Sequence, residues 1–140
     1  MREAILEAVQ SGSIDDLRVA VDLNELKPEL AAGPVADPVA FWKTLSVDGN
    51  GRDILAVLGK LFDMPYATQP LGKDPENTSL YIWPGFADRA LDKLSADEEA
   101  QLASLETAEK IAVMKAGGRY TGWRVMIGAD GVWHTFRRYD

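Results

Sequence analysis

The sequence of 140 residues contains no cysteine and a single histidine, His134. Without cysteine the chain has no disulfide, thiol nucleophile, iron–sulfur ligand or cysteine-bearing zinc site. A zinc site would need three carboxylates beside the one imidazole, an uncommon ligand set, and the H-E-x-x-H pattern is absent. We therefore predict no metal site and no cofactor, and we assign no catalytic residue.

Basic residues and long apolar runs are also scarce. The chain has 15 lysine and arginine residues against 22 acidic residues, a net charge of −7. Because nucleic acid is a polyanion, this charge disfavours non-specific binding to it. No segment approaches the roughly 18 apolar residues of a membrane span, and Glu3 and Glu7 stand where a signal peptide has its apolar stretch. We predict neither a nucleic-acid partner nor a membrane span.

The residues that are present are typical of a globular chain, with 46% hydrophobic and 26% charged residues. Length and patterning predict a single α+β domain over residues 1–140. Apolar periodicity and capping residues predict a helical hairpin over 2–27 and helices over about 38–45, 53–62, 96–105 and 107–116. This helix-rich N-terminal two-thirds should pack on a small antiparallel sheet formed around a C-terminal β-hairpin.

That hairpin, over about residues 120–139, is the strongest pattern in the chain. Two alternating segments flank Asp130-Gly131, a preferred two-residue hairpin turn. With Ala129 opposite Val132, one face is the predicted core and carries Trp123, Val125, Ile127, Val132, His134 and Phe136. The other face carries Arg124, Met126, Trp133, Thr135, Arg137 and Tyr139.

A lone hairpin is marginal in water, so further elements must cover it. Residues 80–83, Leu-Tyr-Ile-Trp, predict a third strand at an edge of the sheet. Residues 68–79 contain prolines and polar turn formers, and they predict no regular element.

Two patterns have both a functional and a structural interpretation. Residues 48–53 resemble part of a calcium loop, but Ser46 and Val57 stand where that loop needs carboxylates, so we favour a tight turn before a helix. An imidazole is a candidate general base near neutral pH. Because G-x-S-x-G is absent and alternation places His134 on the apolar face, we favour a structural histidine with one hydrogen bond.

Charge is distributed unevenly along the chain. Residues 119–140 contain four arginines and two aspartates, a net charge of +2, which leaves −9 for the other residues of the −7 chain. Arginines beside aromatic rings suit the recognition of a carboxylate, a phosphate or an acidic peptide. The alternative is that this face packs under the acidic helices, where Arg124 and Arg137 pair with Glu or Asp, and this alternative stays open.

A second aromatic cluster, Tyr81, Trp83 and Phe86, surrounds Pro84-Gly85 beside the polar segment 68–79. Aromatic rings next to polar loops often bind sugars or extended peptides, because rings supply contact area at a small entropic cost. The competing interpretation is that two of these three rings fill the core.

Three segments together resemble a group of uncharacterised, exported proteins of α-proteobacteria: residues 71–74 (Leu-Gly-Lys-Asp), 81–84 (Tyr-Ile-Trp-Pro) and 123–136, whose pattern is W-x-x-x-I-G-x-D-G-x-W. The resemblance extends over residues 38–140. It implies an envelope location and transfers no activity or site residue. Two locations are therefore left open, the periplasm or envelope if a leader was removed and the cytoplasm otherwise.

These observations predict a non-catalytic binding or interaction module of a bacterium that recognises a small anionic or peptide-like ligand, or a protein partner. The predicted ligand-binding residues are Trp83, Arg124, Trp133, Arg137 and Tyr139. The alternative is a small carboxylate-dependent hydrolase acting on saccharide or cell-wall material, with Glu76 and Asp88 as candidate acids about 5–10 Å apart across a cleft. A third hypothesis is a homo-oligomer that pairs through the hairpin edge.

Overall fold

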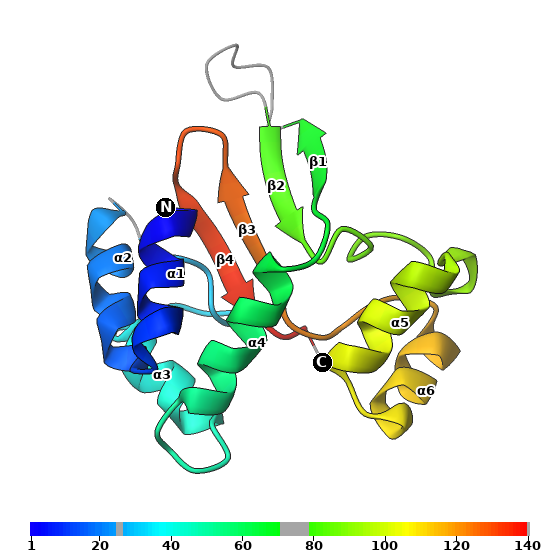
Figure 1. Cartoon of the computed structure of the whole chain (residues 1–140), viewed down its shortest axis with the longest axis horizontal. Helices are drawn as coiled ribbons and strands as arrows, with labels where there is room; N and C mark the ends of the chain where they lie inside the picture. The colour runs from blue at the N-terminus through cyan, green and yellow to red at the C-terminus, as the bar shows by residue number, and fades with distance from the viewer. Residues whose placement is uncertain (25–26, 71–78, 140) are drawn as a thin grey trace.

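The computed structural model describes residues 1–24, 27–70 and 79–139, and this part of the chain contains six α-helices and one four-stranded sheet (Figure 1). The helices are α1 (Arg2–Ser11), α2 (Leu17–Leu23), α3 (Pro38–Leu45), α4 (Arg52–Phe62), α5 (Ala96–Leu105) and α6 (Ala108–Gly117). The strands are β1 (Ala67–Pro70), β2 (Ser79–Trp83), β3 (Arg124–Gly128) and β4 (Trp133–Arg137). The predicted α+β class, with a sheet that includes the C-terminal hairpin, is confirmed.

Three helices, α3, α5 and α6, begin where the sequence provides a capping side chain. The Asp37 carboxylate accepts a hydrogen bond from the Ala40 amide at 3.2 Å, and Pro38 occupies the first turn of α3. Ser95 and Glu98 form the predicted reciprocal capping box at α5. Such caps satisfy amide groups that have no partner inside the helix, and they explain why the predicted starts of α3, α5 and α6 agree with the structure to within about one residue.

The sheet is antiparallel throughout, in the order β1-β2-β3-β4. The predicted third strand exists as β2, but its placement at an edge is wrong because β1 pairs beyond it. The prediction that residues 68–79 form no regular element is likewise wrong for β1. Thr68 and Gln69 are exposed and show no apolar alternation, so pairing with β2, which sequence periodicity cannot detect, determines this strand.

The hairpin register corrects a second prediction. Arg124 pairs with Arg137 and Met126 with Thr135, as expected, but Ile127 pairs with Trp133 across a β-bulge. The chain reverses through Gly131 at φ 86°, and the Gly128 amide donates to the Val132 carbonyl at 2.9 Å. His134 is therefore the extra residue of the bulge, and Trp133 moves to the side opposite the one predicted.

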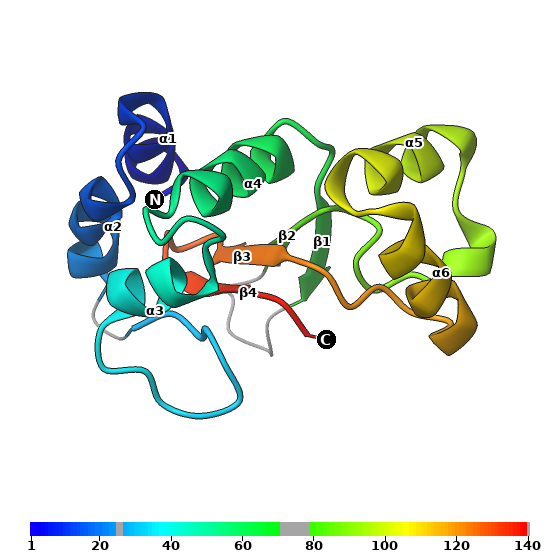
Figure 2. The same ribbon diagram turned by 90° about the horizontal axis from the view of Figure 1, so that it is seen from below.

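One side of the sheet, here called the helix-covered face, packs against α1, α2, α3 and α4 (Figure 2). Its members are Tyr81, Trp83, Val125, Ile127, Trp133 and Phe136. Trp133 stacks on Trp42 of α3 with ring centroids 5.5 Å apart. This face belongs to the larger hydrophobic core, whereas two side chains predicted to be in it are not fully buried: Val132 is 38% exposed and His134 is half-buried.

The opposite side of the sheet, here called the arginine face, carries Arg124, Met126, Thr135 and Arg137. The same side of β2 contributes Leu80 and Ile82 to a smaller core with the helices α5 and α6, which lie beside the sheet in Figure 2. Each of these two helices has one buried residue, Leu102 and Met114 respectively. The α5–α6 unit is thus attached through a smaller apolar contact than the four N-terminal helices.

Two further contacts join segments distant in the sequence to the hairpin and to the residue that follows it. The Glu29 amide donates to the His134 carbonyl at 2.8 Å and the Phe136 amide donates to the Glu29 carbonyl at 3.2 Å, so the outer edge of β4 is partly occupied by this segment. Glu106, at the end of α5, forms an ion pair with Arg138 at 3.0 Å. No helix within the described ranges has the length and apolar character of a membrane span.

Candidate functional site

The sheet separates the five predicted ligand-binding residues. Trp83 and Trp133 lie on the helix-covered face, whereas Arg124 and Arg137 lie on the arginine face with Tyr139 beside them. A single recognition surface made of all five side chains therefore does not exist.

Trp133 is a core residue with 1% of its surface exposed. Its indole Nε1 donates a hydrogen bond to the Thr135 carbonyl at 3.1 Å, which satisfies its polar atom inside the protein. The ring also stacks on Trp42. The prediction that Trp133 faces a ligand is corrected, because the bulge at His134 turns the indole into the core.

Arg124, Arg137 and Tyr139 form a compact group, here called the arginine–tyrosine cluster. Both guanidinium groups lie over the Tyr139 ring, whose centroid is 4.7 Å from Cζ of Arg124 and 4.2 Å from Cζ of Arg137. Arg124 also pairs with Asp88 at 2.8 Å, and Arg137 pairs with Glu29 at 2.8 Å. The two like charges, directly opposite across the strands, are offset by two acids and a ring face.

The intramolecular interpretation of the arginines is thus correct in part. Their side chains are 11% and 15% exposed, respectively, and each has an acidic partner. These partners, Asp88 and Glu29, lie in connecting segments and not in the acidic helices. Both acids are 53% exposed, so water weakens the two ion pairs.

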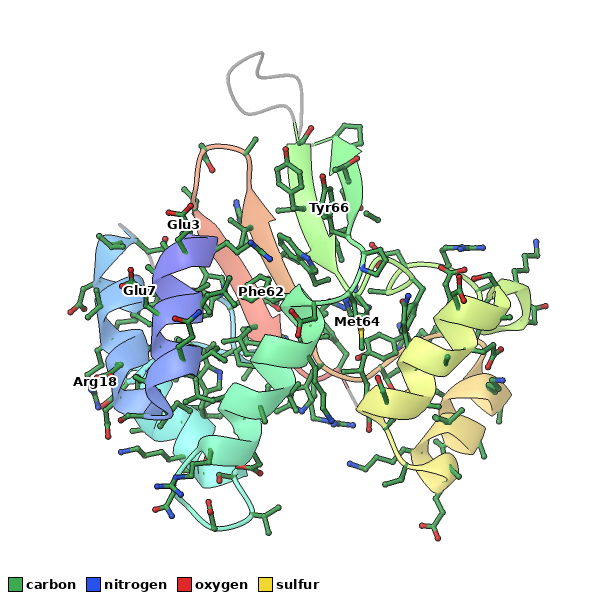
Figure 3. All side chains as sticks on the ribbon, viewed as in Figure 1. Glu3, Glu7, Arg18, Phe62, Met64 and Tyr66 are labelled. Carbon is green, nitrogen blue, oxygen red and sulfur yellow. The ribbon has the colours of Figure 1, made fainter. Side chains whose placement is uncertain are left out.

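Trp83 lines a different feature, an open cavity of about 730 Å³ that we call the aromatic groove. The groove lies between the end of α4, the segment leading to β1 and the turn of the hairpin (Figure 3). Four aromatic residues line it: Phe62, Tyr66, Tyr81 and Trp83. Met64, Ile127 and the backbone of the hairpin turn complete much of the wall.

The rings of the groove contact one another edge to face. Phe62 and Trp83 lie 5.0 Å apart at 80°, and Tyr66 and Tyr81 lie 5.2 Å apart at 75°. Exposure rises outward, because Trp83 is 5% exposed and Tyr66 is 56% exposed. The buried ring of Trp83 and the half-buried ring of Tyr81 pack against Tyr66 and hold it in position. The result is a preformed apolar platform whose outer edge is exposed to solvent.

The backbone explains where Tyr66 lies. Helix α4 ends at Phe62, and Pro65 directs the chain toward β1. The Gly85 amide then donates to the Pro65 carbonyl at 2.9 Å. A Cβ atom at residue 85 would lie 2.9 Å from the same carbonyl oxygen, so the close approach requires glycine.

Sequence reasoning missed Phe62, Met64 and Tyr66 as site residues, because only the pairing of β1 with β2 brings Tyr66 to Tyr81. Two of the three rings of the predicted aromatic cluster are buried, as its competing interpretation expected: Trp83 in the larger core, and Phe86 in the smaller core against Tyr120. Tyr81 and Trp83 of that cluster were the sequence signal for the groove.

Two charged side chains lie at the groove. Arg2 donates to the Phe62 carbonyl at 3.4 Å, and its Cζ lies 5.5 Å from the centroid of the Phe62 ring. Asp63 also lines the wall. These two side chains are opposite in charge, so together they add no net charge to the wall of the groove.

Of the candidate catalytic groups, only Asp88 and His134 lie within the described residues. Asp88 is bound to Arg124, and Glu76 lies outside the described residues. His134 Nε2 is buried and has no hydrogen-bond partner in the described ranges, so the hydrogen bond predicted for this ring is not seen at that atom. No group of three or more His, Cys, Asp or Glu side chains is placed to hold a metal in the part of the chain that the structure describes.

The turn at residues 46–53 uses its acids for local hydrogen bonds. Burial acts to raise the pKa of Asp53, but hydrogen bonds from the Ser46 hydroxyl and the Val47 amide lower it below its ordinary value of 3.8. The Asn50 amide likewise lowers the pKa of Asp48. These contacts belong to a tight turn that precedes α4.

No protein-family model matches this chain, and neither the curated proteins nor the solved structures include a significant match to it. The resemblance to exported α-proteobacterial proteins therefore stays a prediction.

Proposed function

We propose that the protein is a non-catalytic binding module that takes a peptide-like ligand in the aromatic groove. The observation that carries this proposal is the position of Tyr66, which is 56% exposed while its ring packs on Tyr81 in a cavity of about 730 Å³. An apolar or aromatic side chain of the ligand would cover the outer edge of this platform. The peptide backbone would then lie near Arg2 and Asp63.

Size and composition support this choice. Cavities that bind small ligands commonly enclose about 300–1,000 Å³ and combine apolar walls with a few polar groups. The groove has both properties, and its buried rings are held by other rings. A preformed site loses little conformational entropy on binding, so a modest apolar contact can produce measurable affinity.

The groove also explains why we favour a peptide over a free anion at this face. Arg2 lies across the ring of Phe62, and Asp63 lies in the same wall. One donor and one acceptor of opposite charge suit the carbonyl and amide groups of a peptide backbone. They do not provide a net positive field for an anion.

The proposal is tested with an array of ten-residue peptides, followed by fluorescence anisotropy of the strongest binder. We expect the wild-type protein to select peptides with Phe, Tyr, Trp or Leu. The variant Tyr66→Ala should bind the selected peptide about tenfold more weakly, because it removes the aromatic ring that the ligand is proposed to cover. Val113→Ala is the matched control, since Val113 is 73% exposed on α6, away from the groove.

Two outcomes contradict the proposal. One is an array on which the wild-type protein shows no preference for apolar or aromatic side chains. The other is equal affinity of the wild-type protein and Tyr66→Ala for the selected peptide.

The hydrolase hypothesis has no specific observation in its favour. A general acid would need a raised pKa. Among the described residues, the carboxyl groups with a shifted pKa are those of Asp37, Asp48, Asp53 and Glu98, and all four are lowered. The homo-oligomer hypothesis would have to use an edge of β4 that Glu29 already occupies in part.

A further inference from the structure

A smaller cavity of about 290 Å³ lies on the other side of the sheet, at the end of β3 that is farther from the aromatic groove. It is lined by Ala87, Asp88, Arg119, Tyr120, Arg124 and Tyr139. We propose that this cavity binds a small oxyanion, namely a phosphate or carboxylate group, through Arg119, Arg124 and Tyr139. The proposal does not depend on the peptide-binding function.

The two guanidinium groups at the cavity are satisfied to different degrees within the chain. Arg124 donates through Nη1 to Asp88 and through Nη2 to the carbonyls of Ala87 at 3.2 Å and Tyr120 at 3.5 Å, but its Nε is buried without a hydrogen-bond partner in the described ranges. A buried donor of this kind is costly to leave unsatisfied. Arg119 is exposed, and its side chain forms no ion pair with any residue that the structure describes.

The cavity also has a net positive charge and a small volume. Its two arginines and one aspartate give a net charge of +1 in a chain of −7. Guanidinium groups bind carboxylates and phosphates through paired, charge-assisted hydrogen bonds. The volume of about 290 Å³ is at the lower end of ligand cavities, so it suits one phosphate or carboxylate group and not a nucleotide.

Tyr139 supplies the third group. Burial, with a smaller contribution from Glu29, raises the pKa of Tyr139 above its ordinary value of 10.0. The phenol, like any tyrosine, is protonated at neutral pH and can donate a hydrogen bond, and the raised pKa extends this state to higher pH. Its ring, which contacts the guanidinium groups of Arg124 and Arg137, also packs on the Arg124 side chain.

Asp88 acts in this proposal as an internal competitor. Its carboxylate pairs with Arg124 at the cavity wall but is itself 53% exposed. An incoming anion must share the guanidinium with this acid or displace it. The affinity for a simple anion is therefore expected to be about millimolar, and it should increase when the negative charge of residue 88 is removed.

The test is a titration with sodium phosphate and, separately, with sodium acetate at constant ionic strength, followed by the backbone amide NMR signals of the full chain. Saturable shifts are expected at Asp88, Arg119 and Tyr139, with a dissociation constant of about 1 mM for the better anion. Arg119→Gln should weaken binding about tenfold, and Arg119→Lys should restore part of it. Because Arg119 is exposed, neither change threatens folding.

Matched variants distinguish a site from a general charge effect. Arg52→Gln removes one exposed positive charge at α4 and should leave the dissociation constant unchanged. Asp88→Asn should tighten binding. The proposal is overturned by non-saturable shifts with both anions, by equal affinity of Arg119→Gln and the wild type, or by an equal loss in Arg52→Gln. Tyr66→Ala should bind the anion normally, so this result is separable from the peptide experiment.

Discussion

The two faces of the C-terminal hairpin share the same strands but use aromatic rings in different ways. On the helix-covered face, rings pack on other rings, from the buried Trp133 to the exposed Tyr66. On the arginine face, the one ring of the cluster, Tyr139, contacts two cations that also have acidic partners. The first arrangement leaves an apolar edge in contact with water, and the second leaves charges balanced within the chain.

This difference indicates which face is available to a large ligand. Apolar surface that stays exposed is stabilised when a partner covers it. The partly exposed ion pairs of the arginine face would have to be broken first, which costs part of any binding energy. We therefore propose the aromatic groove for a peptide, and only a small anion for the cavity beside Arg124.

The largest expected effect on stability is the loss of a buried ring of the helix-covered face, Trp133. The comparison is the loss of the exposed ring of Tyr66, which packs on Tyr81 of that face. Trp133→Ala should lower the free energy of unfolding by about 3–5 kcal/mol, because it leaves a large cavity and removes the contact with Trp42. Tyr66→Ala should lower it by less than about 1 kcal/mol, because that ring is half in water. Urea denaturation of both variants measures the difference. Similar losses for the two variants would mean that the exposed ring is structural.

A smaller effect is expected on the arginine face. Arg124→Gln and Arg137→Gln should each lower the free energy of unfolding by about 1–2 kcal/mol, through lost packing on Tyr139 and a lost ion pair with a half-exposed acid. The control is Arg18→Gln, because both side chains of the Arg18–Asp37 ion pair are exposed. This change should lower the free energy of unfolding by less than about 0.5 kcal/mol. Equal losses of unfolding free energy in all three variants would show that the arginine–tyrosine cluster stabilises the fold no more than an exposed ion pair does.

The smallest effect concerns alkaline pH. Because burial raises the pKa of Tyr139 in the folded protein, the unfolded chain loses this proton first as the pH rises above 10. The contribution of Tyr139 to stability is thus complete below pH 10 and is lost as the pH rises through the raised pKa. Tyr139→Phe keeps the ring, so its stability should fall less steeply than that of the wild type above pH 10. Parallel pH profiles of unfolding would contradict this assignment.

The helices were the most predictable part of the fold, since their signals are local. Asp37 before Pro38, and the pair of Ser95 and Glu98, identify helix starts without any tertiary information. Strand β2 and the hairpin were predictable for the same reason, because alternation is visible within a short window. Strand β1 was not, since its four exposed or half-buried residues show no pattern of their own.

The site was only partly predictable, and one residue explains most of the difference. The Asp130-Gly131 pair is compatible with a two-residue turn and with a longer turn that carries a bulge. The protein has the bulge, so His134 is an extra residue and Trp133 faces Trp42 instead of the arginines. The pairing of Arg124 with Arg137 lies beyond the bulge and was predicted correctly. Tyr66 had no sequence signal, because its partner Tyr81 is reached only through β1.

The most direct measurement is the affinity of the array-selected peptide for two variants side by side, one from each face. Our account predicts that Tyr66→Ala binds it about tenfold more weakly while Arg137→Gln binds it as the wild type does. The opposite result, in which the arginine variant loses the peptide and the tyrosine variant keeps it, would place recognition on the arginine face and contradict the assignment of the aromatic groove.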